Sequence, residues 1–115
     1  MNKYIITQTD ELVRRIPKKP SHLKENKTLS SACFKLKKGE DGVSVDILRL
    51  TSLEKCIKNP EKEIAAILLA KIPMNLGCNC EHKPSKRSIA HAIIIGVTPV
   101  IAKKLGEQCR LEYLD

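Results

Sequence analysis

The stretch AHAIIIGVTPVIAKKLGEQC, residues 90–109, carries the clearest fold signal in the chain. Residues 90–95 are almost entirely apolar, which is typical of a strand covered on both faces. Gly96 ends this run, and Thr98 followed by Pro99 is a typical start for a helix. The buried stripe of that helix is expected at Ile101, Leu105 and Cys109.

A second signal lies in residues 31–48. Residues 31–37 alternate between polar and apolar side chains, as a half-buried strand does. A glycine-containing turn follows at 39–42, and residues 43–47 alternate again, with Ser44 and Asp46 as the polar positions. This pattern predicts a β-hairpin from Ser31 to Leu48.

Two shorter signals flank these regions. Residues 12–16 form a short extended or helical piece that Pro17 stops. Thr51 and Glu54 have the spacing of a capping box, in which each side chain can satisfy the other residue's free backbone N–H. A short helix through residues 56–57 is expected to follow.

The middle of the chain is ambiguous. The apolar residues of 61–77 fit both a helix and a buried strand, and Pro73 breaks whatever precedes it. Residues 78–82 look extended, and a short last strand could form at 111–114. With an early hairpin and late strand–helix units, the whole order predicts one α+β domain over residues 1–115, with a mixed sheet and two or three short helices.

The net charge of +8 belongs mostly to the first third of the chain. Residues 1–38, the basic N-terminal segment, hold ten basic and three acidic side chains, a balance of +7. Such a concentration attracts nucleic-acid phosphates or an acidic protein partner. The alternative is that these lysines only hydrate the surface. The candidate polyanion-binding residues are Arg14, Arg15, Lys18, Lys19, Lys24, Lys27, Lys86 and Arg87.

Aromatic residues are scarce. Tyr4, Phe34 and Tyr113 are too few for a platform on which single-stranded bases stack. Phosphate contacts should therefore dominate any nucleic-acid binding, with poor base readout. The sequence has no P-loop, dinucleotide-binding glycine pattern, H-E-x-x-H or EF-hand loop, so we expect no cofactor.

Cys78-x-Cys80-x-His82 is the pattern that suggests a metal. On a strand these three side chains share one face. Zinc, however, is usually held by two cysteines with two or more residues between them, which lets the backbone fold around the ion. We therefore expect Cys78 and Cys80 to be small core residues and no metal site to form here.

A small enzyme is the second hypothesis. His91 lies at the start of the most apolar strand, where a histidine is more often a core residue than a catalyst. It could nevertheless move a proton in a nuclease-type site while arginines stabilise a phosphorane. His22 and His82 are expected to be exposed to solvent. The residues of such an enzyme site would be Arg14, Arg15, Ser31, Asp46 and His91.

No segment has the pattern of a membrane span or an export signal. The longest nearly uncharged apolar stretch, residues 64–70, is too short to cross a bilayer. The N-terminus turns polar at Thr7, so no signal-peptide apolar region forms. We expect a cytoplasmic location, no membrane contact and reduced cysteines, and the oligomeric state stays open.

Four short motifs occur in a fixed order: RRIP at 14–17, SSACF at 30–34, VSVD at 43–46 and AHA at 90–92. This order resembles a group of small bacterial proteins for which no activity is established. The resemblance runs from about residue 12 to the helix near Leu105, and it implies a bacterial, cytoplasmic origin and no particular chemistry.

A looser similarity concerns an enzyme fold. Arg14 or Arg15 followed by Ser30 or Ser31 is similar to the early arginine and serine of ADP-ribosyltransferase-like folds. The similarity implies a degenerate ADP-ribosyl-type domain, since no convincing late catalytic glutamate follows and 115 residues is short for that fold.

Three hypotheses result. The first is a non-enzymatic accessory or binding module with a basic face for nucleic-acid phosphates or an acidic protein. The second is the small enzyme. The third is a structural subunit of a bacterial complex. Convergence of the five enzyme-site residues in one pocket would favour an enzyme or small-ligand binding. Their dispersal around a lysine-rich face would favour the binding module.

Overall fold

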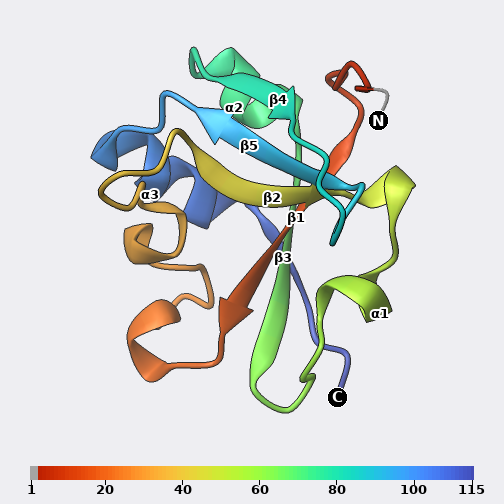
Figure 1. Cartoon of the computed structure of the whole chain (residues 1–115). Helices are drawn as coiled ribbons and strands as arrows, with labels where there is room; N and C mark the ends of the chain where they lie inside the picture. The colour runs from red at the N-terminus through yellow and green to blue at the C-terminus, as the bar shows by residue number, and fades with distance from the viewer. Residues whose placement is uncertain (1–2) are drawn as a thin grey trace.

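One antiparallel sheet of six strands organises the computed structural model, which describes residues 3–115 (Figure 1). The strand order is β4-β5-β2-β1-β3-β6, and each neighbouring pair is antiparallel. The strands are β1 (Glu11–Pro17), β2 (Val43–Ile47), β3 (Glu63–Leu69), β4 (Asn79–His82), β5 (His91–Ile95) and β6 (Arg110–Glu112). The predicted combination of helices and strands in one small domain is confirmed, but the expected mixed sheet is wrong, because no parallel pair occurs in the described part of the chain.

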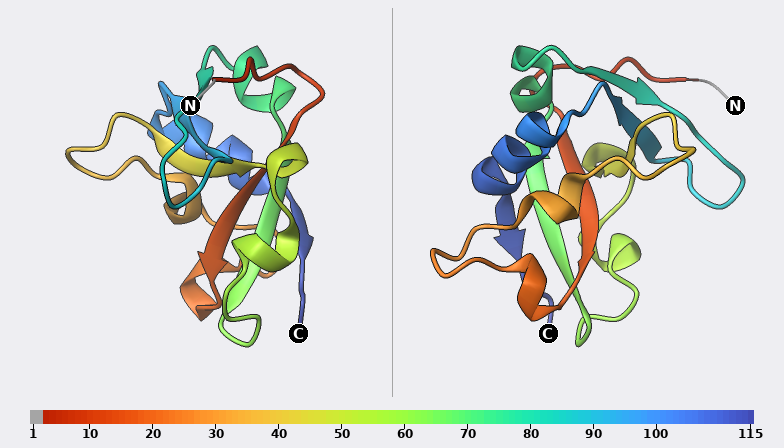
Figure 2. Two further views of the ribbon diagram at one scale, coloured as in Figure 1. Left: turned by 45° about the vertical axis from the view of Figure 1, so that its right-hand side comes forward. Right: turned by 90° about the vertical axis from the view of Figure 1, so that its left-hand side faces the viewer.

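The two faces of the sheet are covered by different helices. Helix α3 lies on one face, packed against the 3-10 helix η2, while the short helix α1 lies on the opposite side of β1 (Figure 2). The α-helices are α1 (Leu53–Cys56), α2 (Lys71–Asn75) and α3 (Pro99–Gln108). The 3-10 helices are η1 (Pro20–His22), η2 (Ser31–Phe34) and η3 (Leu48–Leu50).

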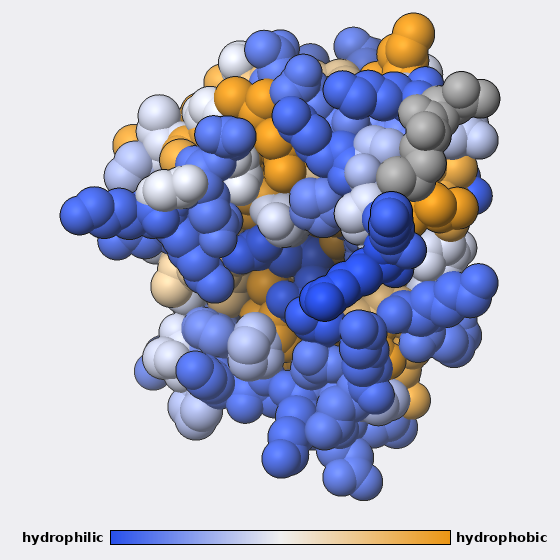
Figure 3. All heavy atoms as spheres, in the orientation of Figure 1, coloured by the Kyte–Doolittle hydropathy of each residue, from blue (hydrophilic) through white to orange (hydrophobic). Residues whose placement is uncertain are grey.

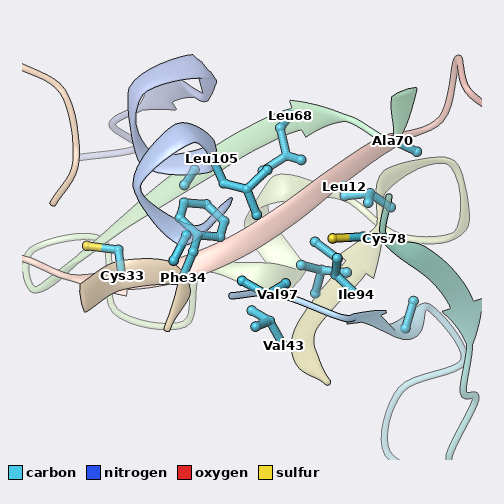
Figure 4. Close-up of a cluster of buried hydrophobic side chains, with 14 of the residues drawn as sticks. Leu12, Cys33, Phe34, Val43, Leu68, Ala70, Cys78, Ile94, Val97 and Leu105 are labelled. Atoms are coloured by element: carbon cyan, nitrogen blue, oxygen red, sulfur yellow. The ribbon is translucent and has the colours of Figure 1, made fainter. Parts of the chain in front are cut away.

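Strand alternation divides the core into two clusters. Leu12, Phe34, Ile94 and Leu105 belong to the larger one, between the sheet and α3 (Figure 4). Val13, one residue along β1, points to the other face and joins the smaller cluster. That smaller cluster consists of Val13, Cys56, Ile57, Ala65 and Ile67. It anchors α1 to the sheet and leaves the neighbouring part of this face open.

Strands β1 and β2 pair over a short distance and then diverge. β1 pairs along its whole length with β3, but with β2 only at Leu12–Ile47 and Val13–Asp46. Beyond these pairs the two strands separate at a wide angle (Figure 1). The backbone groups that would have continued the ladder need other partners, and Arg14 provides one, as described below.

The helix after Thr98 is confirmed. The Thr98 side-chain oxygen accepts the Ile101 N–H at 3.2 Å, and Leu105 is fully buried. Ile101 and Cys109 are only half-buried, because Ala102 and Gly106 make the closest approach of α3 to the core. A Cβ placed on Gly106 would lie 2.6 Å from the Leu29 carbonyl oxygen, so this packing requires a glycine.

The predicted hairpin from Ser31 to Leu48 is wrong. Residues 31–34 form η2 rather than a strand, and β2 pairs with β1 and β5 instead. Cys33 and Phe34 are adjacent yet both buried, which a strand with one buried face cannot achieve. Tertiary contacts of this segment with α3 therefore override the local alternation.

Other local predictions have mixed outcomes. The N-cap of α1 is Ser52, whose hydroxyl accepts the Lys55 N–H at 3.3 Å, so the predicted capping by Thr51 is wrong. The ambiguous stretch 61–77 divides into strand β3 followed by helix α2. Pro73 falls within the first turn of α2, where no intrahelical N–H bond is lost.

Candidate functional site

A cavity of about 530 Å³ opens on the α1 side of the sheet. Its walls come from β1, β2, the start of β5, the loop 83–90 and the region around α1. Figure 3 shows the surface hollowed near the centre of this face, among hydrophilic side chains. The cavity lies where β2 and α1 frame the part of the sheet that no helix covers.

The cavity is strongly basic. Within residues 3–115 its wall carries one carboxylate, Asp46. Opposing it are six basic side chains, which are Arg14, Arg15, Lys55, Lys58, Lys86 and Arg87. A concave site with such an excess of positive charge raises the local concentration of anions.

Arg14 fills the gap between the diverging strands. Its Nε donates to the Cys33 carbonyl at 2.6 Å and its Nη1 donates to the Ser44 carbonyl at 2.7 Å. Burial lowers the pKa of Arg14 from its ordinary value, with the Glu40 carboxylate opposing that shift, and an arginine in this environment stays charged. A guanidinium has five N–H groups, so donors remain for a ligand.

Two other charged groups of the wall have partners of their own. Arg15 forms an ion pair with Glu63 at 3.2 Å and is half exposed. Asp46 accepts a hydrogen bond from the Ser88 hydroxyl at 3.3 Å.

Burial, and secondarily the charge of Asp46, raise the pKa of the Cys56 thiol to about 12. Cys56 is therefore a neutral group in the cavity wall.

His91 is oriented by a backbone carbonyl. Its Nδ1 lies 2.9 Å from the Lys83 carbonyl oxygen, which can only accept, so Nδ1 is the protonated nitrogen of this contact. In the neutral ring Nε2 is then an acceptor, and it lies 3.4 Å from the Ser44 hydroxyl. A histidine held in one tautomer with its free nitrogen beside a hydroxyl can accept a proton from it.

The structure brings together most of the residues expected for an enzyme site. Arg14, Arg15, Asp46 and His91 line the same cavity. Ser31 does not line it, because it lies exposed at the start of η2. Four of the five residues therefore converge in one cavity, and the fifth, Ser31, lies outside it.

The predicted polyanion-binding residues divide into two groups. Lys86 and Arg87 join the two arginines in the cavity, whereas the four N-terminal lysines do not line it. Lys18 pairs with Asp115 at 2.6 Å, and Lys24 and Lys27 border a separate groove beside Tyr113.

Ser44, Lys55 and Lys58 are among the cavity residues that were not proposed as site residues from the sequence. Ser44 belongs to the polar face of β2, and its alternation with buried valines was the available signal. Lys55 and Lys58 had no such signal, since their position depends on the packing of α1 against β1.

The Cys78-Cys80-His82 pattern has a structural role. Cys78 is buried in the larger core cluster. The expectation that His82 is exposed is wrong, because the Tyr4 backbone N–H donates to its Nδ1 at 2.8 Å while Nε2 donates to the Ile89 carbonyl at 2.6 Å. Both ring nitrogens are thus occupied. Across residues 3–115 no group of three His, Cys, Asp or Glu side chains is arranged to hold a metal ion.

None of the helices described between residues 3 and 115 has both the length and the apolar character that crossing a bilayer requires. Comparisons of the chain with protein-family models, with curated proteins and with solved structures find no match.

Proposed function

We propose that the cavity binds phosphate groups of nucleic acid. The observation that carries this proposal is the set of six cations around a wall with a single carboxylate, among the residues that the structure describes. Three of these cations are arginines, whose planar guanidinium matches the geometry of phosphate oxygens.

The size of the cavity supports a short segment of strand as the ligand. A volume of about 530 Å³ falls within the usual range of small-molecule sites, so one or two nucleotides could enter. No Phe, Tyr or Trp from residues 3–115 lines the wall, which leaves no ring on which a base could stack. Binding should therefore depend on phosphate and sugar contacts and be weakly selective for sequence.

Charge density favours phosphate over an acidic protein as the partner. The six cations surround one concave site, whereas an acidic polypeptide carries single carboxylates spaced along a flexible chain. An arginine can contact two oxygens of a phosphodiester or of a carboxylate together, so the preference rests on how the charges are spaced along the ligand. A cytoplasmic location forms part of the proposal and agrees with five free cysteine thiols.

The test compares pairs of variants that remove equal charge. Labelled DNA and RNA oligonucleotides and an acidic polypeptide would be titrated at several salt concentrations. Lys86→Ala/Arg87→Ala alters the cavity, Lys18→Ala/Lys19→Ala alters the N-terminal segment, and Lys103→Ala/Lys104→Ala alters exposed positions of α3 outside the cavity.

We expect the cavity pair to lose the most affinity and to flatten the log–log salt slope by about 1 to 2 units, since each phosphate contact on duplex contributes about 0.9. The α3 pair should leave the slope unchanged. Equal losses in all three pairs would mean that only general charge matters, and absence of nucleic-acid binding at low salt would refute the proposal. Stronger binding of the acidic polypeptide would reassign the cavity to a protein partner.

A further inference from the structure

Ser44 and His91 form a hydroxyl–imidazole pair inside the basic cavity. They lie on neighbouring strands, β2 and β5, where Ser44 is paired with Ile93 and Asp46 with His91. The Ser44 hydroxyl is 3.4 Å from His91 Nε2, and the opposite ring nitrogen is fixed by the Lys83 carbonyl at 2.9 Å. A nucleophile, a base within reach and a third group orienting the base are the parts of an activated nucleophile.

Two other nucleophilic side chains of the wall, Ser88 and Cys56, are less suited to attack. The Ser88 hydroxyl donates to Asp46, and Cys56 is buried among apolar side chains with its thiol protonated. Ser44, in contrast, is exposed to the cavity and points away from the core along with the polar face of β2. Contacts of this kind often lengthen in a free enzyme and tighten when substrate binds.

We propose that Ser44 is a nucleophile, with His91 as its general base, and that it forms a covalent intermediate with a phosphodiester substrate in which Ser44 Oγ has replaced one of the two ester oxygens on phosphorus. This inference rests on the proposed function, because the cations are needed to hold the phosphate beside Ser44. It adds a reaction, phosphodiester hydrolysis, to a site that otherwise only binds.

Two steps complete the reaction. His91 Nε2 takes the Ser44 proton as Oγ bonds to phosphorus, the bond from phosphorus to the leaving oxygen breaks, and the imidazolium returns the proton to that oxygen. Water then gives a proton to Nε2 and attacks phosphorus, the Oγ–phosphorus bond breaks, and the proton returns to Oγ. The sum is one phosphodiester and one water converted to a phosphomonoester and an alcohol.

The surrounding cations stabilise the charge that develops in each step. The phosphorus centre gains negative charge as it becomes five-coordinate, and fixed positive groups aimed at that position lower the barrier. Arg14 holds the Ser44 backbone through the Ser44 carbonyl, so the nucleophile and one cation move as a unit.

The experiment uses bis(4-nitrophenyl) phosphate, a chromogenic diester, with wild type, Ser44→Ala, His91→Asn and the exposed control Ser31→Ala. We expect an initial burst of one nitrophenolate per enzyme, and a 4-nitrophenyl phosphoryl adduct on the peptide containing Ser44 by mass spectrometry. Ser44→Ala should lose burst and adduct. His91→Asn should slow the reaction by about 10² to 10⁴-fold. Ser31→Ala should behave as wild type.

A base role predicts chemical rescue, which a structural role does not. Added imidazole should restore part of the burst in His91→Gly and have no effect on Ser44→Ala. All variants would first be checked for folding by circular dichroism and for oligonucleotide binding.

Wild type that binds oligonucleotides yet forms no adduct would overturn this inference and leave the proposed function standing. If Ser44→Ala still cleaves RNA but not DNA and releases 2′,3′-cyclic phosphate, the ribose hydroxyl is the nucleophile and the assignment of Ser44 is refuted. Failure of wild type to bind any nucleic acid would remove the proposed function, and this inference with it.

Discussion

At the scale of single residues, the Arg14 side chain links β1 to β2 at the point where the two strands no longer pair. Its guanidinium donates to the Ser44 carbonyl of β2, beyond the last β1–β2 pair at Val13–Asp46, and to the Cys33 carbonyl of η2. An exposed arginine in an ion pair would contribute much less to stability, because solvent screens it.

Replacing this side chain should therefore be costly. We expect Arg14→Met to lower the free energy of unfolding by about 2 kcal/mol, since two carbonyls are left without their donor. Arg15→Met is the matched control on the next position, where only the ion pair with Glu63 is lost and about 0 to 1 kcal/mol is expected. Urea denaturation measures both, and similar values for the two variants would contradict the role given to Arg14.

At the scale of elements, the approach of α3 to the loop around Leu29 leaves no room for a side chain at Gly106. The Leu29 N–H donates to the Gly106 carbonyl at 3.1 Å, and a Cβ on Gly106 would lie 2.6 Å from the Leu29 carbonyl oxygen. The Leu29 carbonyl oxygen is a backbone atom, and a Cβ is fixed to the backbone of residue 106, so no side-chain rotation can relieve the clash.

Gly106→Ala should consequently destabilise the chain, although alanine is the better helix former by about 1 kcal/mol. We expect a net loss of about 1 to 3 kcal/mol from overpacking, with reduced protection of the Leu29 amide in hydrogen exchange. Lys103→Ala, on the exposed side of α3, should change stability little. A Gly106→Ala protein as stable as wild type would show that α3 shifts freely.

Elements with strong local signals were predicted well from the sequence, and elements determined by distant contacts were not. Thr98 and Pro99 start α3 as expected because capping involves only neighbouring residues. Residues 31–34 have an alternating pattern, yet their contact with α3, some 70 residues away, makes them helical.

The same distinction applies to the candidate site. His91 and Asp46 were recognisable as polar residues on apolar strands, but only the pairing of β2 with β5 places them opposite each other. Lys55 reaches the cavity because α1 packs on β1, which no local pattern indicates.

At the scale of the whole molecule, burial leaves the thiols unreactive. The pKa of Cys80 and of Cys109 is raised to about 11, chiefly by burial, although both side chains are partly exposed. Raised pKa values mean that these groups remain protonated at neutral pH.

In the folded chain, labelling of the cysteines with Ellman's reagent at pH 8 should thus be slow. For Cys80 and Cys109 the rate should keep rising about tenfold per pH unit up to about pH 10, where an ordinary thiol with a pKa of about 8.5 has already levelled off. All five cysteines should react rapidly in urea. Fast reaction of the native protein at pH 8, or a plateau below pH 9, would contradict the burial described here.

The double attachment of Arg14 also bears on how this chain could evolve. Because one side chain both joins β1 to β2 and positions the backbone of the proposed nucleophile, selection for a sturdier scaffold and selection for a new substrate would act on the same codon. In a saturation library, position 14 should accept almost no change under either selection. Lys86 and Arg87, on an exposed loop, should tolerate change under selection for stability alone, and under selection for a new ligand they are where altered preference should arise first.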